Sequence, residues 1–193
     1  MRLPERGDDQ IRIGVALTVP EPYGSALQEA RASFGDPLAP FIPPHITLLG
    51  PTVVDESDLD VLGVHLAEVA SRFRPFALHL RGTGSFRPVS PVVFVQVVEG
   101  ISICEDLESA VRSGPLAQEL RFNYHPHVTV AHEVDEDALE RAFDGLADFE
   151  ASFVVDGFQS YHHGDDGMWR PEKTYPFTGH GASAGRADRQ DGS

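Results

Sequence analysis

The sequence His-Ile-Thr-Leu at residues 45–48 returns as His-Val-Thr-Val at residues 127–130. Side chains of a β-strand alternate between its two faces, so a His and a Thr two residues apart point the same way. Each copy therefore predicts a strand with one imidazole and one hydroxyl on one face and two apolar side chains on the other. One copy alone is typical of an ordinary strand with a polar face. Two copies in equivalent surroundings indicate a shared site.

The order of elements around the two copies also repeats. Apolar runs predict strands at residues 11–19 and 92–98, and each is followed by a helix, the motif strand, a second helix and a further strand. A repeated order of elements indicates an internal duplication. We therefore expect two lobes, roughly residues 11–90 and 91–178, each of which contributes its motif strand to a common cleft.

The ends of the chain differ in composition from this patterned region. Residues 1–10 are polar, and residues 179–193 are rich in Gly, Ala, Ser and charge, so we expect a flexible N-terminus and a disordered tail. Residues 11–178 are expected to form a single domain. Its last part predicts two strands, at about residues 151–161 and 168–177, joined by a solvated turn.

Composition limits the classes of function. The 193 residues are 41% hydrophobic, which is ordinary for a globular domain. A formal net charge of −15 argues against a partner such as duplex DNA that is held through many phosphates, and favours a small nucleotide or a short RNA end. The chain shows neither a membrane-spanning run nor a secretory signal, so we expect no membrane partner. The single cysteine, Cys104, fits a reducing, cytoplasmic setting and a buried packing role.

Two His-Thr pairs facing one cleft are suited to the cleavage of a phosphodiester. Hydrolysis needs a base to activate water and an acid to protonate the departing oxygen, and each well-placed group contributes about 10²–10⁴-fold to the rate. A histidine, with an ordinary pKa of about 6.5, can take either role near neutral pH. Threonine hydroxyls can donate to the non-bridging phosphate oxygens, where negative charge is held in the transition state.

The two motifs resemble those of the 2H phosphoesterases, a family that includes 2′-5′ RNA ligase-like proteins and 2′,3′-cyclic nucleotide phosphodiesterases. The matching stretches are Pro-Pro-His-Ile-Thr-Leu-Leu-Gly-Pro at residues 43–51 and His-Pro-His-Val-Thr-Val-Ala-His at residues 125–132. The similarity in element order spans about residues 11–178, but only the two motifs are specific. The resemblance implies a bilobal, pseudo-twofold α+β fold with a central cleft. We expect two mainly antiparallel sheets flanking that cleft, with the helices on the outside.

The resemblance also implies residue roles and an activity. His45 and His127 would form the acid/base pair, and Thr47 and Thr129 would bind phosphate. For hydrolysis we expect His127 to activate water and His45 to serve the leaving 2′ or 3′ oxygen. The expected protein is a monomer that needs no cofactor and acts on 2′,3′-cyclic phosphates of small nucleotides or RNA ends, or catalyses 2′-5′ ligation in reverse.

A nucleotide substrate would be served by an aromatic platform, because stacking on a base contributes about 1–3 kcal/mol. Phe86 is the first candidate for such a platform, because it follows a predicted loop at residues 82–84. The other candidate substrate contacts are three aromatic residues and one arginine: Tyr124, Tyr161, Trp169 and Arg170. Three further cations are candidate phosphate contacts: Arg87, Arg121 and Lys173. Core packing and ordinary surface charge are the alternative interpretations for all of them.

Three other interpretations stay open. His125, His127 and His132 could be drawn as a zinc set, but His132 follows His127 by five residues and is expected on the opposite strand face, so we expect no metal. The substrate could be another cyclic phosphodiester, such as ADP-ribose 1″,2″-cyclic phosphate. The protein could also be a non-catalytic module that binds nucleotides or RNA ends, although binding alone does not require two titratable groups.

Overall fold

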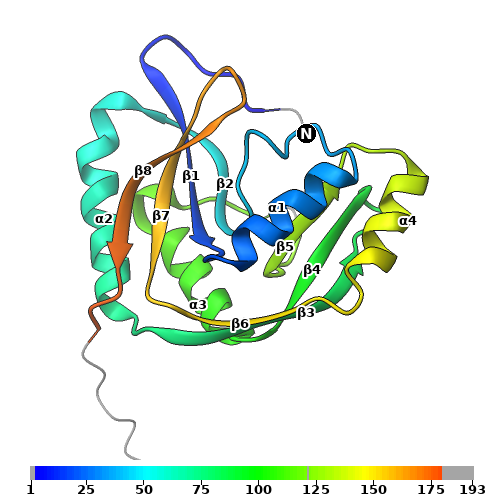
Figure 1. The fold of residues 1–193 in the computed structure, drawn as a ribbon. Coiled ribbons are helices and arrows are strands. Elements are labelled where there is room, and N and C mark those ends of the chain that lie inside the picture. Colours follow the sequence, from blue (N-terminus) through cyan, green and yellow to red (C-terminus); the bar gives the residue numbers. More distant parts are fainter. Residues whose placement is uncertain (1–2, 121, 180–193) are drawn as a thin grey trace, which may run out of the picture.

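The computed structural model describes residues 3–120 and 122–179 of the chain (Figure 1). Eight strands form one antiparallel sheet in the order β6-β3-β4-β5-β2-β1-β7-β8. The strands are β1 (Gln10–Thr18), β2 (His45–Asp55), β3 (Phe76–Ser85), β4 (Val92–Glu99), β5 (His127–His132), β6 (Glu150–Val155), β7 (Gly157–His163) and β8 (Trp169–Pro176). The helices are α1 (Tyr23–Ser33), α2 (Leu59–Arg72), α3 (Ile101–Val111) and α4 (Glu136–Gly145).

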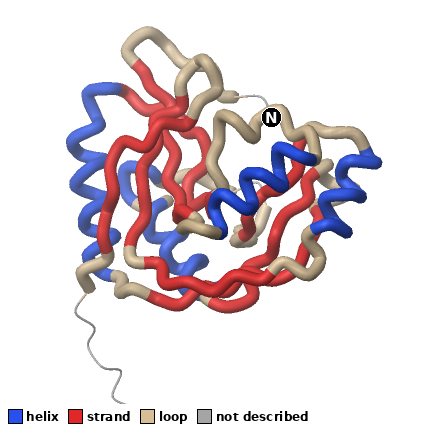
Figure 2. Tube along the Cα trace, viewed as in Figure 1, coloured by secondary structure: helices blue, strands red, loops and turns tan. Residues whose placement is uncertain are grey.

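The sheet is continuous, which corrects the expectation of two separate sheets. Its two four-stranded halves join where β2 pairs with β5, and the pair in register there is Ile46 with Val128. Both residues are the central apolar members of the two motifs and are buried, at 1% and 0% exposure. The sheet curls strongly, so its outer strands curve away from this central seam (Figures 1 and 2). The α+β class is confirmed, whereas the pseudo-twofold duplication remains a prediction.

The helices divide between the two halves of the sheet. Helix α4 contacts β3, β4 and β5, and α1 contacts β5, whereas α2 contacts β8 and α3 contacts β2. Helix α2 buries a stripe of Leu62, Leu66 and Val69 at the spacing of one helix face. Helix α4 begins at a capped end, because the Asp135 side chain accepts a hydrogen bond from the Ala138 amide at 2.7 Å. No helix of the described residues is long and apolar enough to cross a bilayer.

The final part of the chain contains three strands where two were expected. The run predicted at residues 151–161 breaks at Asp156, and its two parts lie far apart in the sheet: β6 pairs with β3 at one edge, whereas β7 pairs with β1. A Cβ on Gly157 would lie 2.6 Å from the Tyr175 carbonyl oxygen, so only glycine fits where the chain enters β7. Residues 82–84, expected as a loop, belong to β3.

The chain ends are only partly described. Residues 3–9 carry no helix or strand, but Arg6 pairs with Asp165 at 2.5 Å and Arg12 donates to the Pro4 carbonyl at 2.8 Å, so this segment lies against the loop before β8. Of the tail predicted at residues 179–193, Gly179 is described and its amide donates to the Phe73 carbonyl at 2.8 Å, whereas residues 180–193 lie outside the described residues.

Candidate active site

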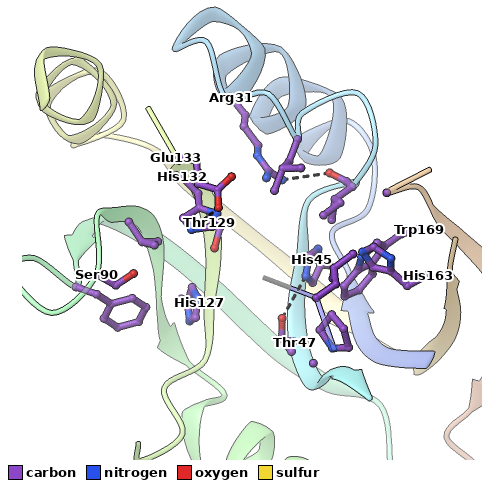
Figure 3. Close-up of a pocket in the computed structure, with 18 residues that line it drawn as sticks. Arg31, His45, Thr47, Ser90, His127, Thr129, His132, Glu133, His163 and Trp169 are labelled. Carbon is purple, nitrogen blue, oxygen red and sulfur yellow. Dashed lines mark hydrogen bonds and ion pairs between the residues drawn. The ribbon is translucent and has the colours of Figure 1, made fainter. Parts of the chain in front are cut away.

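A cleft of about 480 Å³ opens over the central seam of the sheet (Figure 3). It is lined by all four motif side chains, namely His45, Thr47, His127 and Thr129. These side chains share one face because Ile46 and Val128, which separate them along each strand, are buried on the other face. The convergence of the two motifs on one cleft is the arrangement that the sequence predicted.

The pairing of β2 with β5 fixes how the four side chains face one another. The strands are antiparallel and in register at Ile46 and Val128, so His45 and Thr47 flank one side of the seam and His127 and Thr129 flank the other. In an antiparallel register the residue before one member of a pair lies opposite the residue after the other. Each histidine is therefore opposite the threonine of the other motif, and the two histidines lie on a diagonal.

A β-bulge follows the threonine in both motif strands. Leu48 is the extra residue of β2 against β1, and Val130 is the extra residue of β5 against β4. A bulge makes two successive residues oppose one and shifts the alternation that follows. As a result Gly50 and His132 return to the cleft side, where both line the cavity. The expectation that His132 faces away from the site is therefore wrong, because strict alternation does not hold across the bulge.

Both motif imidazoles are held by the same backbone device. His45 Nδ1 lies 2.7 Å from the Pro43 carbonyl oxygen, and His127 Nδ1 lies 2.6 Å from the His125 carbonyl oxygen. A carbonyl oxygen only accepts, so Nδ1 must carry a proton in both rings and Nε2 of the neutral ring is left as a base. The His45 Nε2 accepts from the Thr47 hydroxyl at 3.1 Å. In the sequence, this hydrogen bond from Nδ1 to the carbonyl two residues earlier is accompanied by a proline directly before each motif histidine, at residues 44 and 126.

Burial makes both imidazoles harder to protonate. The pKa of His45 is lowered to about 4, mainly by desolvation and in addition by the nearby charges of Arg31 and His127, against the opposing hydrogen bond to Pro43. Desolvation also lowers the pKa of His127, against its hydrogen bond to His125. Both rings are therefore neutral bases near pH 7 in the free protein.

Two of the expected stacking residues lie against the motif histidines. The Trp169 ring centroid is 4.7 Å from that of His45, and the Phe86 ring meets His127 edge-on at 4.9 Å. Both aromatics also line the cleft. The Phe94 ring packs against both His127 and Phe86, with ring centroids 5.0 Å and 4.4 Å away. Whether Trp169 or Phe86 also contacts substrate stays a prediction.

The other nominated substrate contacts lie outside this cleft. Tyr161 is 1% exposed and packs behind Trp169, and its hydroxyl bonds with the side chains of Thr18 and Gln159, so it cannot offer a stacking face. The Tyr124 hydroxyl donates to the Thr47 carbonyl at 2.9 Å, which makes Tyr124 a support of the first motif strand.

The nominated cations are also engaged elsewhere. Arg170 pairs with Asp166 and Arg87 with Glu140, while Lys173 lies over the Tyr175 ring at 5.2 Å. Arg121 lies outside the described residues.

Four polar residues that sequence reasoning did not place in the site line the cleft, namely Arg31, Ser90, Glu133 and His163. Arg31 reaches it from α1, although the helices were expected on the outside, and His163 reaches it from the end of β7, where a solvated turn was expected. His163 is only 4% exposed, and its ring lies 5.8 Å from Trp169. The local sequence carries little signal for Arg31 or His163, because each position depends on the packing of distant elements.

The described residues contain no group of three His, Cys, Asp or Glu side chains placed to hold a metal ion. Within the considered zinc set, the rings of His125 and His127 are 6.2 Å apart and stack side by side. The metal-independence of the reaction stays a prediction.

Comparison with known proteins agrees with this fold. A family model described as the 2′-5′ RNA ligase superfamily matches residues 19–167. A Bacillus cytotoxicus protein named "Putative phosphoesterase" is 30% identical over 144 residues, which cover 72% of this chain and 82% of that protein. The crystal structure of E. coli LigT complexed with NADP+ aligns with a TM-score of 0.64 at 21% identity, over 88% of this chain and 99% of that chain. LigT complexed with 3′-AMP aligns with a TM-score of 0.61 at 19% identity, over 88% and 99%.

The fold is of the α+β class, and the sequence matches place the chain among the phosphoesterases. The chain belongs to the 2′-5′ RNA ligase superfamily of 2H phosphoesterases. The family that the two motifs predicted is therefore confirmed.

Proposed function

We propose that this protein is a metal-independent phosphodiesterase that opens 2′,3′-cyclic phosphates on small nucleotides or RNA ends, and that it can catalyse 2′-5′ ligation in the reverse direction. The observation that carries the proposal is the meeting of two Nδ1-anchored imidazoles and two threonine hydroxyls in one cleft. Support for a nucleotide ligand comes from E. coli LigT, whose structures hold NADP+ and 3′-AMP.

The proposed reaction uses one imidazole on each side of the phosphorus atom. His127 Nε2 accepts a proton from water, and the water oxygen forms a new bond to phosphorus. The bond from phosphorus to the 2′ or 3′ oxygen breaks, and protonated His45 gives its proton to that oxygen. Thr47 and Thr129 donate to the non-bridging oxygens as charge accumulates on them. The product is a phosphomonoester, and the pair returns to its starting state by moving one proton from His127 to His45 through solvent.

The anionic substrate favours protonation of His45, which is neutral in the free protein near pH 7. His45 can act as an acid only when protonated, but burial holds its pKa at about 4. A phosphate anion beside the ring favours the charged imidazolium and so raises that pKa. The acid is therefore formed mainly when substrate is bound.

Turnover of 2′,3′-cyclic nucleotides with EDTA present tests the proposal. We expect hydrolysis to a single phosphomonoester at an unchanged rate after chelation. Turnover that EDTA abolishes would indicate a metal mechanism. Nucleotide binding without turnover would indicate a binding module, and turnover of ADP-ribose 1″,2″-cyclic phosphate alone would move the substrate class. A parallel incubation of RNA fragments carrying 2′,3′-cyclic phosphate and 5′-hydroxyl ends tests for ligation.

A further inference from the structure

Arg31 gives the cleft a fixed positive charge. Among the described residues that line the cleft it is the only arginine or lysine. The motif threonines are neutral, and the lowered pKa values of His45 and His127 leave both rings uncharged near pH 7. Arg31 is thus the cationic side chain that an anionic substrate meets there at any pH near neutral, beside one carboxylate of the described lining, Glu133, in a chain whose net charge of −15 otherwise repels anions.

The guanidinium is held firmly by two of its three nitrogens. Nε donates to Asp36 Oδ2 at 2.8 Å, and Nη1 donates to the Ile42 carbonyl at 3.2 Å. The side chains of the Arg31–Asp36 pair are only 4% and 0% exposed. The third nitrogen, Nη2, has no hydrogen-bond partner among the described residues. Figure 3 shows the Arg31 side chain descending from α1 toward the space above the motif residues.

Asp36 fixes the position of this guanidinium. Besides Arg31 Nε, its carboxylate accepts from the Leu38 amide at 2.8 Å and from the His132 amide at 3.1 Å. Asp36 therefore joins α1, the loop after it and the second motif strand. A buried ion pair contributes little net stability, because desolvation offsets the attraction. The buried Arg31–Asp36 pair is better explained by a role in binding, because it holds the Nη2 donor of Arg31 toward the cleft.

We propose that Arg31 binds a phosphate oxygen of the substrate through Nη2, with Asp36 as its positioning residue. The inference deepens the proposed function and rests on it for the substrate class. The phosphate can be the reacting one or a second phosphate of the same nucleotide. A positioned guanidinium is suited to either, because its donors form charge-assisted hydrogen bonds with phosphate.

Binding measured by fluorescence tests the proposal without requiring turnover. Trp169 is the single tryptophan of the chain and lies beside His45 in the cleft, so its emission reports occupancy. The probes are inorganic phosphate and adenosine 3′-monophosphate. The variants are Arg31→Lys and the double variant Arg31→Gln/Asp36→Asn, which removes both charges of the buried pair. Arg87→Gln is the matched control, because Arg87 is also ion-paired but does not line this cleft.

We expect the double variant to weaken binding of both probes by about 10- to 100-fold, the usual range for a hydrogen bond to a charged group. Arg31→Lys should show a smaller loss, and Arg87→Gln should bind like the parent. Unchanged affinity in folded Arg31→Lys and in the double variant would overturn the proposal. Thermal unfolding checks that each variant is folded.

Kinetics then identify which phosphate Arg31 contacts. The substrates are adenosine 2′,3′-cyclic phosphate with and without a 5′-phosphate. Equal loss of kcat/KM on both supports contact with the reacting phosphate. Loss confined to the 5′-phosphorylated substrate supports contact with a second phosphate, and loss on neither overturns the proposal. If the parent turns over neither substrate, the proposed function fails, while the fluorescence result still decides the role of Arg31.

Discussion

Strand β2 presents His45 to the cleft beside Trp169 and near the charge of Arg31, whereas β5 presents His127 beside Phe86 and Phe94. Both rings anchor Nδ1 on the carbonyl two residues earlier. The shared motif therefore fixes the tautomer in both halves, while non-local neighbours make the two imidazoles electrostatically different. This difference is the physical basis for giving them separate roles.

The largest expected effect is the loss of either imidazole. His127→Ala should abolish hydrolysis of a 2′,3′-cyclic substrate, and His45→Ala should reduce kcat by about 10²–10⁴-fold, because each removes one proton-transfer group. The double variant should be little worse than His127→Ala, since the two groups act as a unit. Steady-state rates on one cyclic nucleotide measure this. A nearly unchanged rate in His127→Ala would refute its role, and the half-buried His162, which does not line the cleft, provides a suitable control as His162→Ala.

The next effect compares the two threonines. Thr47→Val and Thr129→Val keep the side-chain shape and remove the hydroxyl, so each should lower kcat by about 10²-fold through loss of a phosphate donor. They should differ in one respect. The Thr47 hydroxyl also donates to the neutral form of His45, so its removal should raise the pKa of His45 as well. A shift of the pH–rate profile in Thr47→Val, and none in Thr129→Val, is the expected result; identical shifts in both would contradict it.

The sequence predicts the elements of this site better than their surroundings. The His-x-Thr spacing places a histidine and a threonine on one strand face by local geometry alone, and the structure has both motifs in one cleft. The order of helices and strands through β5 also follows from local periodicity. The side-chain facing within each motif and the order of elements depend on neighbours within a few residues, so they can be predicted from the sequence.

The features that the sequence did not predict depend on contacts between distant elements. The break at Asp156 is visible as Asp-Gly, but nothing local says that β6 and β7 join opposite halves of the sheet. His132 returns to the cleft only because β5 bulges against β4. In the sequence, Arg31 looks like any charged residue of an amphipathic helix. Its place in the cleft depends on the hydrogen bonds of its guanidinium to Asp36 and to the Ile42 carbonyl, which only the structure shows.

The pH dependence of activity tests the difference between the histidines more finely. One ring must be protonated and the other neutral, and both pKa values lie below the ordinary 6.5 in the free protein. The profile of kcat/KM, which reports the free protein, should therefore be bell-shaped with its maximum on the acid side of pH 6.5. Removing the Arg31 charge in Arg31→Gln/Asp36→Asn should move the limb that His45 controls to higher pH, because Arg31 lowers the pKa of His45. A maximum above pH 7.5 in the parent would contradict this picture.

The smallest expected effect is on stability. The pKa of His45 is about 4 in the folded protein and 6.5 in an unperturbed chain, so the unfolded chain takes up the proton first as the pH falls. The stability contributed by neutral His45 is therefore fully present above pH 6.5 and is lost as the pH falls toward 4, by at most about 3 kcal/mol. His45→Gln cannot titrate, so the difference in free energy of unfolding between parent and variant should change across this window and stay constant above it. Urea unfolding at several pH values measures the difference, with His127→Gln as the matched comparison. A change of the same sign is expected for His127, because burial also lowers its pKa; a difference that stays constant with pH there would mean that burial does not disfavour the charged form of that ring.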